Sequence, residues 1–191
     1  MLNLTEQMIR EKLINSEQKE EYIYAMITLI EKAISIGTIL WISILVNKLV
    51  PTLLFLVSFF GLRKRTGGYH ANTFLICYIE TVGTYIILLY INSILVKHIL
   101  FIYMMLGISM CIIFLIGTVN HPNLHMSKKE VSAAKKSSRQ ILLLESSIVC
   151  FLGIMDMEVI IISYMASAII MCAILLCIAK ILGQEVNEYE N

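Results

Sequence analysis

One histidine and one cysteine lie seven residues apart where the chain passes from a polar segment into an apolar one. His70 and Cys77 follow a run of three cations and the Gly67-Gly68 pair, and Glu80 comes three residues after the cysteine. A cysteine becomes a nucleophile at neutral pH when a nearby base or cation favours the thiolate. These residue types predict acyl chemistry in which Cys77 attacks and His70 activates it. A thiol that packs as a small apolar side chain is the alternative.

The spacing of this pair restricts the helix that can carry it. Residues seven apart on a straight helix share a face but are separated by roughly 10 Å along the axis, and a histidine and a cysteine cannot bridge that distance. The helix must therefore begin after His70, and Asn72 or Thr73 is suited to be its N-cap. His70 can then fold back over the first turns toward Cys77, where the positive end of the helix also favours a thiolate.

Glu80 is an ionisable group inside an apolar run, and such groups are expected to be functional. It could orient His70 as a third catalytic member, or it could pair with Arg63 or Arg65. A plain structural pairing, or a side chain extended toward the membrane surface, is the third possibility. The cations at 63–65 can also be interpreted as a simple anchor on the cytoplasmic side of a membrane.

The composition indicates a membrane protein. Of 191 residues, 58% are hydrophobic and only 15% are charged, whereas soluble domains are about half apolar and a quarter charged. Long uncharged apolar runs predict a polytopic integral membrane protein with an all-α helical bundle fold. Membrane lipid is therefore an expected partner. A net charge of +1 gives no reason to expect a nucleic-acid partner.

The apolar runs divide the chain into three parts: an amphipathic interfacial helix at 1–32, a transmembrane domain at 33–182 and a polar tail at 183–191. Four apolar segments are expected within the domain, at 73–91, 99–119, 141–154 and 159–182.

The run 33–60 precedes these four segments and is too long for one span of about 20 residues. We expect a hairpin of two short helices that turns near residues 47–51, which gives about six membrane segments. One tilted helix that is kinked before Pro51 would give five segments instead.

Clustered basic residues predict the orientation of the segments. Loops 61–72 and 120–140 carry most of the cations, so the positive-inside rule places both loops in the cytoplasm. Two spans separate these loops, and this parity agrees with a common side. The connections 92–98 and 155–158 then face outward.

Neither the cysteines nor the histidines form a metal-binding pattern. The five cysteines lie in apolar segments without a CxxC spacing, so a disulfide or zinc framework is not expected. His121 and His125 have the i, i+4 spacing that can suit a metal on a helix. Pro122 lies between them and no acidic partner follows. We therefore expect no metal and no cofactor.

The segment around the His–Cys pair resembles the signature of a known family. The accessory gene regulator protein B (AgrB) family, membrane cysteine endopeptidases of Gram-positive quorum sensing, has a signature similar to residues 63–78, RKRTGGYHANTFLICY. The matching positions are Arg63, Gly68, His70 and Cys77. Chain length, the amphipathic start, about six membrane segments and the Lys-rich loop extend the resemblance to nearly the whole chain.

The resemblance implies an enzyme that processes a small AgrD-type propeptide. Cys77, activated by His70, would cleave the propeptide and keep its N-terminal part as a thioester. An internal cysteine or serine of the propeptide would then attack that thioester and close a thiolactone or lactone ring. Members of this family are expected to be homodimers. The acidic tail of such a propeptide could be bound by Arg65, Lys128, Lys129, Lys135 and Lys136, although topology and anionic lipid explain the same cations.

Two functions without covalent chemistry are the alternatives. A small transporter or peptide exporter could line its path with Glu80, Glu145 and Lys48, and it would tolerate a serine in place of Cys77. A membrane-bound assembly protein would tolerate alanine at both His70 and Cys77.

Overall fold

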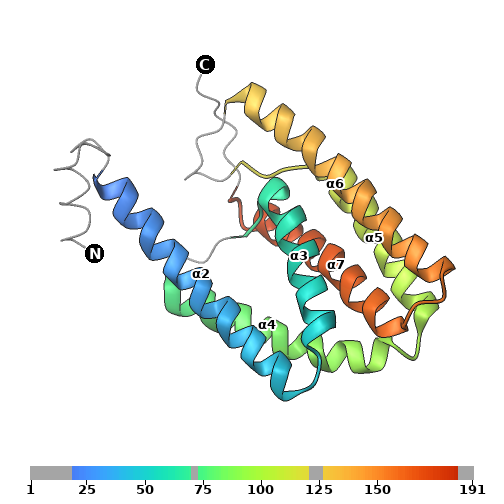
Figure 1. Ribbon diagram of the computed structural model, residues 1–191. Coiled ribbons are helices and arrows are strands. Elements are labelled where there is room, and N and C mark those ends of the chain that lie inside the picture. Colours follow the sequence, from blue (N-terminus) through green and yellow to red (C-terminus); the bar gives the residue numbers. More distant parts are fainter. Residues whose placement is uncertain (1–18, 70–72, 121–126, 185–191) are drawn as a thin grey trace.

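The computed structural model describes residues 19–69, 73–120 and 127–184. These residues form six α-helices and no strand (Figure 1), so the predicted all-α class is confirmed. The helices are α2 (Lys19–Leu45), α3 (Leu49–Thr66), α4 (Phe74–Leu95), α5 (Ile99–Ile116), α6 (Lys128–Ile154) and α7 (Val159–Ile181).

Four of the described helices, α4 to α7, are long and apolar enough to cross a membrane. Each also satisfies its own backbone hydrogen bonds, which a segment in hydrocarbon must do. This supports a membrane protein. The count of about six membrane segments is not confirmed, because α2 and α3 are not among these candidate spans.

The run 33–60 turns tightly between two helices, as predicted, and is not one kinked helix; the first helix is not short, because α2 has 27 residues and begins at Lys19. Helix α2 ends at Leu45, α3 begins at Leu49, and Asn47 between them has a φ of 55°. Asparagine is one of the few residues that adopt this left-handed conformation readily. Pro51 lies in the first turn of α3, where helix N–H groups have no intrahelical partner and proline is tolerated.

Helix α7 lies at the centre of the bundle. Figure 1 shows it between α3, α5 and α6, and it contacts each of these helices. Its buried face is rich in small side chains, which allow helix backbones to approach closely: Ser163, Ala166, Ser167, Ala168, Ala173 and Ala179.

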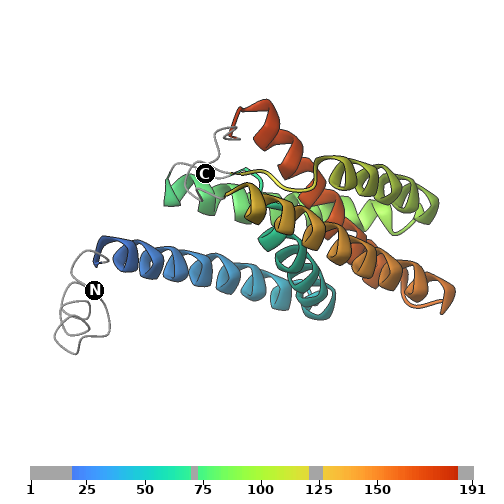
Figure 2. The same ribbon diagram turned by 90° about the horizontal axis from the view of Figure 1, so that it is seen from above.

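Helices α2 and α4 lie at one side of this bundle. Helix α2 packs on α4 and α3, and its N-terminal half extends away from the other helices in both views (Figures 1 and 2). Only three residues of α4 are buried, namely Tyr85, Leu88 and Asn92, and all three lie in its second half. The first half, which carries Cys77, is therefore the less enclosed part.

Several predicted boundaries are wrong because polar residues were interpreted as loop. The predicted loop 61–72 is helical as far as Thr66, and its cations occupy the last turn of α3, where they interact favourably with the helix dipole. The predicted loop 120–140 is helical from Lys128, because Ser127 and Glu130 form a capping box. Helix α4 also continues through Asn92, which was predicted to lie in an outward connection.

The predicted division of the chain into three parts is not tested by the fold. Helix α2 runs without a break across position 32, and residues 1–18 lie outside the described part of the chain. The division therefore stays a prediction.

Candidate active site

The glycine pair after α3 lets the chain turn sharply beside the helix it has just left. Gly67 has a φ of 65° and Gly68 a φ of 121°, both in the region that favours glycine. A Cβ on Gly68 would lie 1.9 Å from Nη1 of Arg63 and 3.2 Å from the Leu175 carbonyl oxygen. A side chain at this position would therefore displace either the guanidinium or the chain itself.

Arg63 holds the turn that the glycines form. Its guanidinium donates hydrogen bonds to the carbonyl oxygens of Gly67 and Tyr69. The Tyr69 N–H donates to the carbonyl oxygen of Leu175 on α7, at 3.2 Å. Two of the predicted site residues thus depend on each other, because the Arg63 guanidinium occupies the space that a side chain at Gly68 would need.

The turn that Arg63 holds is bonded through Tyr69 to two helices that carry thiols, α4 with Cys77 and α7 with Cys172. Cys172 is fully buried in α7, and its thiol donates to the Phe59 carbonyl oxygen at 3.7 Å. Cys77 is exposed. Cys77 is therefore the accessible thiol of the two.

Helix α4 begins at Phe74, after His70, as the spacing argument predicts. Thr73 occupies the N-cap position without a capping bond from its side chain, and the Cys77 N–H donates to the Thr73 carbonyl oxygen at 3.0 Å. Cys77 consequently lies in the first turn. His70 and Asn72 lie outside the described residues, so the approach of His70 to Cys77 stays a prediction.

Glu80 accepts a hydrogen bond from the Tyr69 hydroxyl at 3.2 Å. Burial raises the pKa of Tyr69 above its ordinary value, and the hydrogen bond to Glu80 raises it further. The phenol therefore stays protonated and able to donate. Within the described residues, neither Arg63 nor Arg65 forms an ion pair with Glu80; the two guanidinium groups donate to carbonyl oxygens and a hydroxyl.

Arg65 joins α3 to α6. Its Nε donates to Ser137 Oγ at 2.9 Å, and its Nη1 donates to the Gly61 carbonyl oxygen at 2.7 Å. The segment after α5 completes this end of α3, because Thr118 Oγ1 donates to the Arg65 carbonyl oxygen at 2.9 Å and the Val119 N–H to that of Thr66 at 3.0 Å. The two basic regions thus meet at one end of the molecule.

An open groove of ≈ 600 Å³ runs along α6. Its lining residues are Lys128, Val131, Ser132, Lys135, Lys136, Arg139, Gln140 and Leu143. Of the five cations predicted to bind a substrate tail, three line this groove, whereas Lys129 and Arg65 do not. Arg139 was not predicted; its guanidinium lies 4.8 Å from the Phe114 ring centroid and its Nε donates to the Phe114 carbonyl oxygen.

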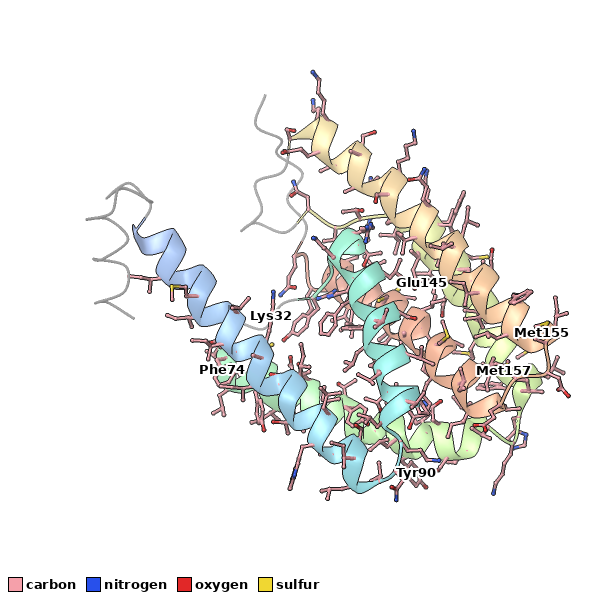
Figure 3. All side chains as sticks on the ribbon, in the orientation of Figure 1. Lys32, Phe74, Tyr90, Glu145, Met155 and Met157 are labelled. Atoms are coloured by element: carbon pink, nitrogen blue, oxygen red, sulfur yellow. The ribbon has the colours of Figure 1, made fainter. Side chains whose placement is uncertain are left out.

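Glu145 is buried in α6 and faces α3 (Figure 3). A Cβ added to Gly61 would lie 2.9 Å from its Oε1, and its Oε2 has no hydrogen-bond partner within the described residues. Lys48, at the start of α3, is thirteen residues before Gly61, which is about 20 Å of helix. Glu145, which lies close to Gly61, is therefore far from Lys48 at the start of α3. The structure does not bring these two residues together to line one transport path.

Sequence reasoning missed Tyr69, Thr118, Val119 and Leu175, which hold the glycine turn in place. Val119 and Leu175 act through backbone atoms, so their residue type carries no signal, whereas Thr118 acts through its side-chain hydroxyl. For Tyr69 the only signal was its position beside His70.

Comparison with known families gives a match over most of the chain. The model of the family described as accessory gene regulator B matches residues 2–182. No curated protein and no solved structure matches the chain. The match spans all six described helices and the segment of the His–Cys pair. The chain therefore belongs to the accessory gene regulator B family.

Proposed function

We propose that this chain is a membrane cysteine endopeptidase that cleaves an AgrD-type propeptide and cyclises it, with Cys77 as nucleophile and His70 as base. Family membership connects the chain to the accessory gene regulator quorum-sensing system and implies an AgrD-type propeptide as partner. The observation that carries the proposal is the exposed Cys77 thiol in the first turn of α4, the helix that Tyr69 connects to the turn held by Arg63.

The first step is acyl transfer to the enzyme. Cys77 Sγ gives its proton to His70 and attacks the carbonyl carbon of the scissile peptide bond. The C–N bond breaks, and the leaving amine takes the proton from His70. The C-terminal part of the propeptide departs, while the N-terminal part stays on Cys77 as a thioester.

The second step closes the ring. An internal thiol or hydroxyl of the propeptide gives its proton to His70 and attacks the thioester carbonyl. The bond between that carbonyl carbon and Cys77 Sγ breaks, and the Cys77 sulfur recovers the proton. Cyclisation competes with hydrolysis, so a nucleophile at the edge of an apolar helix, where water is scarce, suits this chemistry.

Two local features support a reactive thiolate at Cys77. The position in the first turn places the thiol near the positive end of the α4 dipole. The Arg63 guanidinium, which carries a full positive charge, holds the turn that Tyr69 connects to α4 through its bond to Glu80. A cation and a helix N-terminus together are the surroundings that favour thiolate in other reactive cysteines.

The groove on α6 is our proposed site for the acidic tail of the propeptide. Lys128, Lys135, Lys136 and Arg139 give it a concentrated positive charge on an otherwise apolar molecule. Lys129 and Arg65 contribute through long-range charge rather than contact, because they lie outside the groove lining. The homodimer, six membrane segments and a cytoplasmic active site complete the proposal, and the family resemblance is their support.

The proposal is tested by the peptides that cells release. The chain is co-expressed with its propeptide, and the products are weighed for wild type, Cys77→Ala, His70→Ala and the control Cys111→Ala, which removes an exposed thiol on α5. We expect a cyclic product, lighter by one water than the hydrolysed fragment, from wild type and Cys111→Ala only. Cyclic product from Cys77→Ala would overturn the nucleophile. A Cys77→Ser protein with full function would favour the transporter instead.

A further inference from the structure

Tyr69 is held from three directions. Its N–H donates to the Leu175 carbonyl oxygen on α7 at 3.2 Å, and its own carbonyl oxygen accepts from the Arg63 guanidinium. Its hydroxyl reaches α4 and donates to Glu80 Oε1 at 3.2 Å. The backbone of Tyr69 therefore belongs to the end of α3 and α7, while its side chain belongs to the helix that carries Cys77.

Helix α4 accepts this hydrogen bond, and few other contacts fix the first half of the helix. No residue of α4 before Tyr85 is buried. Two side-chain hydrogen bonds connect this half to other described segments: the Tyr69–Glu80 bond and a bond of 3.2 Å between the hydroxyls of Tyr78 and Thr38 on α2. The Tyr78 bond faces α2, whereas the Tyr69 bond faces the side from which Arg63 comes.

The Tyr69–Glu80 bond is worth more at this position than on a soluble protein. Glu80 is an exposed carboxylate in the second turn of a candidate membrane span, where an ionisable group is costly. A hydrogen-bond donor offsets part of that cost, and hydrogen bonds to charged acceptors are the stronger ones. The pair therefore favours one placement of this turn of α4.

We infer that Tyr69 and Glu80 form a positioning pair, which holds the first turns of α4 against the turn that Arg63 fixes at the end of α3 and so sets the position of the Cys77 thiol. Neither residue contacts the reacting atoms in this assignment. His70 is the next residue after Tyr69 in the chain, so the bond also joins the two segments to which the proposed nucleophile and base are attached. This inference rests on the proposed function.

The test is a double-mutant cycle on the acylation step. Purified full-length protein in lipid nanodiscs is mixed with synthetic propeptide, quenched at intervals and weighed intact, which gives the rate constant for thioester formation. The variants are Tyr69→Phe, Glu80→Ala, their combination and Glu80→Gln. Tyr90→Phe, an exposed tyrosine on the second half of the same helix, is the matched control.

We expect Tyr69→Phe and Glu80→Ala each to slow acylation about tenfold, as suits the loss of one hydrogen bond to a charged group. The combination should be no slower than either single variant, because residues that act as a unit are not additive. Glu80→Gln keeps an acceptor oxygen for the phenol and should retain most of the rate. The propeptide concentration at half-maximal rate should be unchanged throughout, and so should the rate of Tyr90→Phe.

Three results would overturn the positioning pair. They are wild-type rates in Tyr69→Phe, losses that multiply in the double variant, and a Glu80→Gln protein as slow as Glu80→Ala. The comparison of Glu80→Gln with Glu80→Ala leaves Tyr69 unchanged, so it tests the pair even if the Tyr69→Phe protein does not fold. The wild-type measurement distinguishes failure of the positioning pair from failure of the proposed function. A wild-type protein that forms no thioester overturns the proposed function itself. Thioester formation at the same rate with and without the Tyr69 hydroxyl overturns the pair alone.

Discussion

The two halves of α4 are held in different ways. In the second half, buried Asn92 donates to Ser167 Oγ on α7 at 3.2 Å and accepts from Ser163, and the Tyr85 hydroxyl lies 2.7 Å from that of Thr52 on α3. In the first half, Cys77 and Glu80 are exposed, and the bonds to other elements come from two tyrosines. Figure 3 labels Phe74, the first residue of α4, and Tyr90, which lies in its second half.

This difference gives the two halves of α4 different roles: the second half stabilises the fold, and the first half carries the proposed chemistry. Buried polar contacts between membrane helices fix the second half of α4 in the bundle. The first half keeps its thiol open to a substrate and depends on a few specific bonds for its position. A change in the second half should therefore alter the stability of the fold, whereas a change around the first half should alter the rate of acylation.

The largest expected effect comes from Gly68→Ala, which breaks the support of the first half. The new Cβ would clash with the Arg63 guanidinium and the left-handed backbone would be strained. We expect a loss of acylation rate of roughly 5- to 150-fold, since strain of this kind costs on the order of 1–3 kcal/mol. Gly83→Ala on α4 is the control, because an added Cβ there meets nothing within 4 Å. Normal acylation in Gly68→Ala would contradict the role given to the turn.

The second half is tested by Asn92→Leu. This change removes the bonds to Ser163 and Ser167, and we expect the free energy of unfolding to fall by about 1–2 kcal/mol. Acylation per folded molecule should not change. Ser93→Ala is the matched control, because its hydroxyl bonds only within α4, to the Tyr90 carbonyl oxygen. Unchanged thermal stability with slower acylation would reverse the assignment of the two halves.

The groove on α6 belongs to neither half of α4, so changes to its cations should affect only the binding of the propeptide. We expect Lys135→Gln with Lys136→Gln to raise the KM for the propeptide several-fold and to leave kcat unchanged. Two contact charges at a partly exposed site are each worth roughly 0.5–1 kcal/mol. Lys129→Gln, a neighbouring cation outside the groove lining, is the control. An equal effect of Lys129→Gln would indicate general charge or lipid attraction in place of a tail site.

The smallest expected effect is that of Thr38→Val, which removes the other tyrosine bond of the first half. This bond joins Tyr78 to α2, which lies away from Arg63, so we expect less than about a threefold loss of acylation rate, as fits a hydrogen bond of average strength. A loss as large as that of Tyr69→Phe would show that both tyrosine bonds position Cys77 equally.

Local patterns predicted the parts of this fold that depend on neighbouring residues. The apolar runs gave four helices, the Asn47 turn gave the hairpin, and the His–Cys spacing gave a helix that begins after His70. Contacts between distant residues were not predictable. Asn92 was assigned to a connection because it is polar, and its partners lie more than 70 residues away on another helix.

The site shows the same limit. Nothing in the spacing of Tyr69 and Glu80 indicates a bond, because the glycine turn and the start of α4 bring them together. Cations at 63–65 and 128–139 were assigned to loops on charge alone. A capping box and the favourable helix C-terminus make those residues helical.

The most direct test of the account is the detection of the acyl-enzyme on Cys77. Wild type and Cys77→Ala are incubated with propeptide, weighed intact, treated with hydroxylamine and digested to locate the adduct, with Cys150→Ala as a second exposed-thiol control. The account predicts a hydroxylamine-labile adduct on the peptide that contains Cys77, present in wild type and Cys150→Ala and absent in Cys77→Ala. An adduct on another residue, or cyclic product from Cys77→Ala, would contradict it.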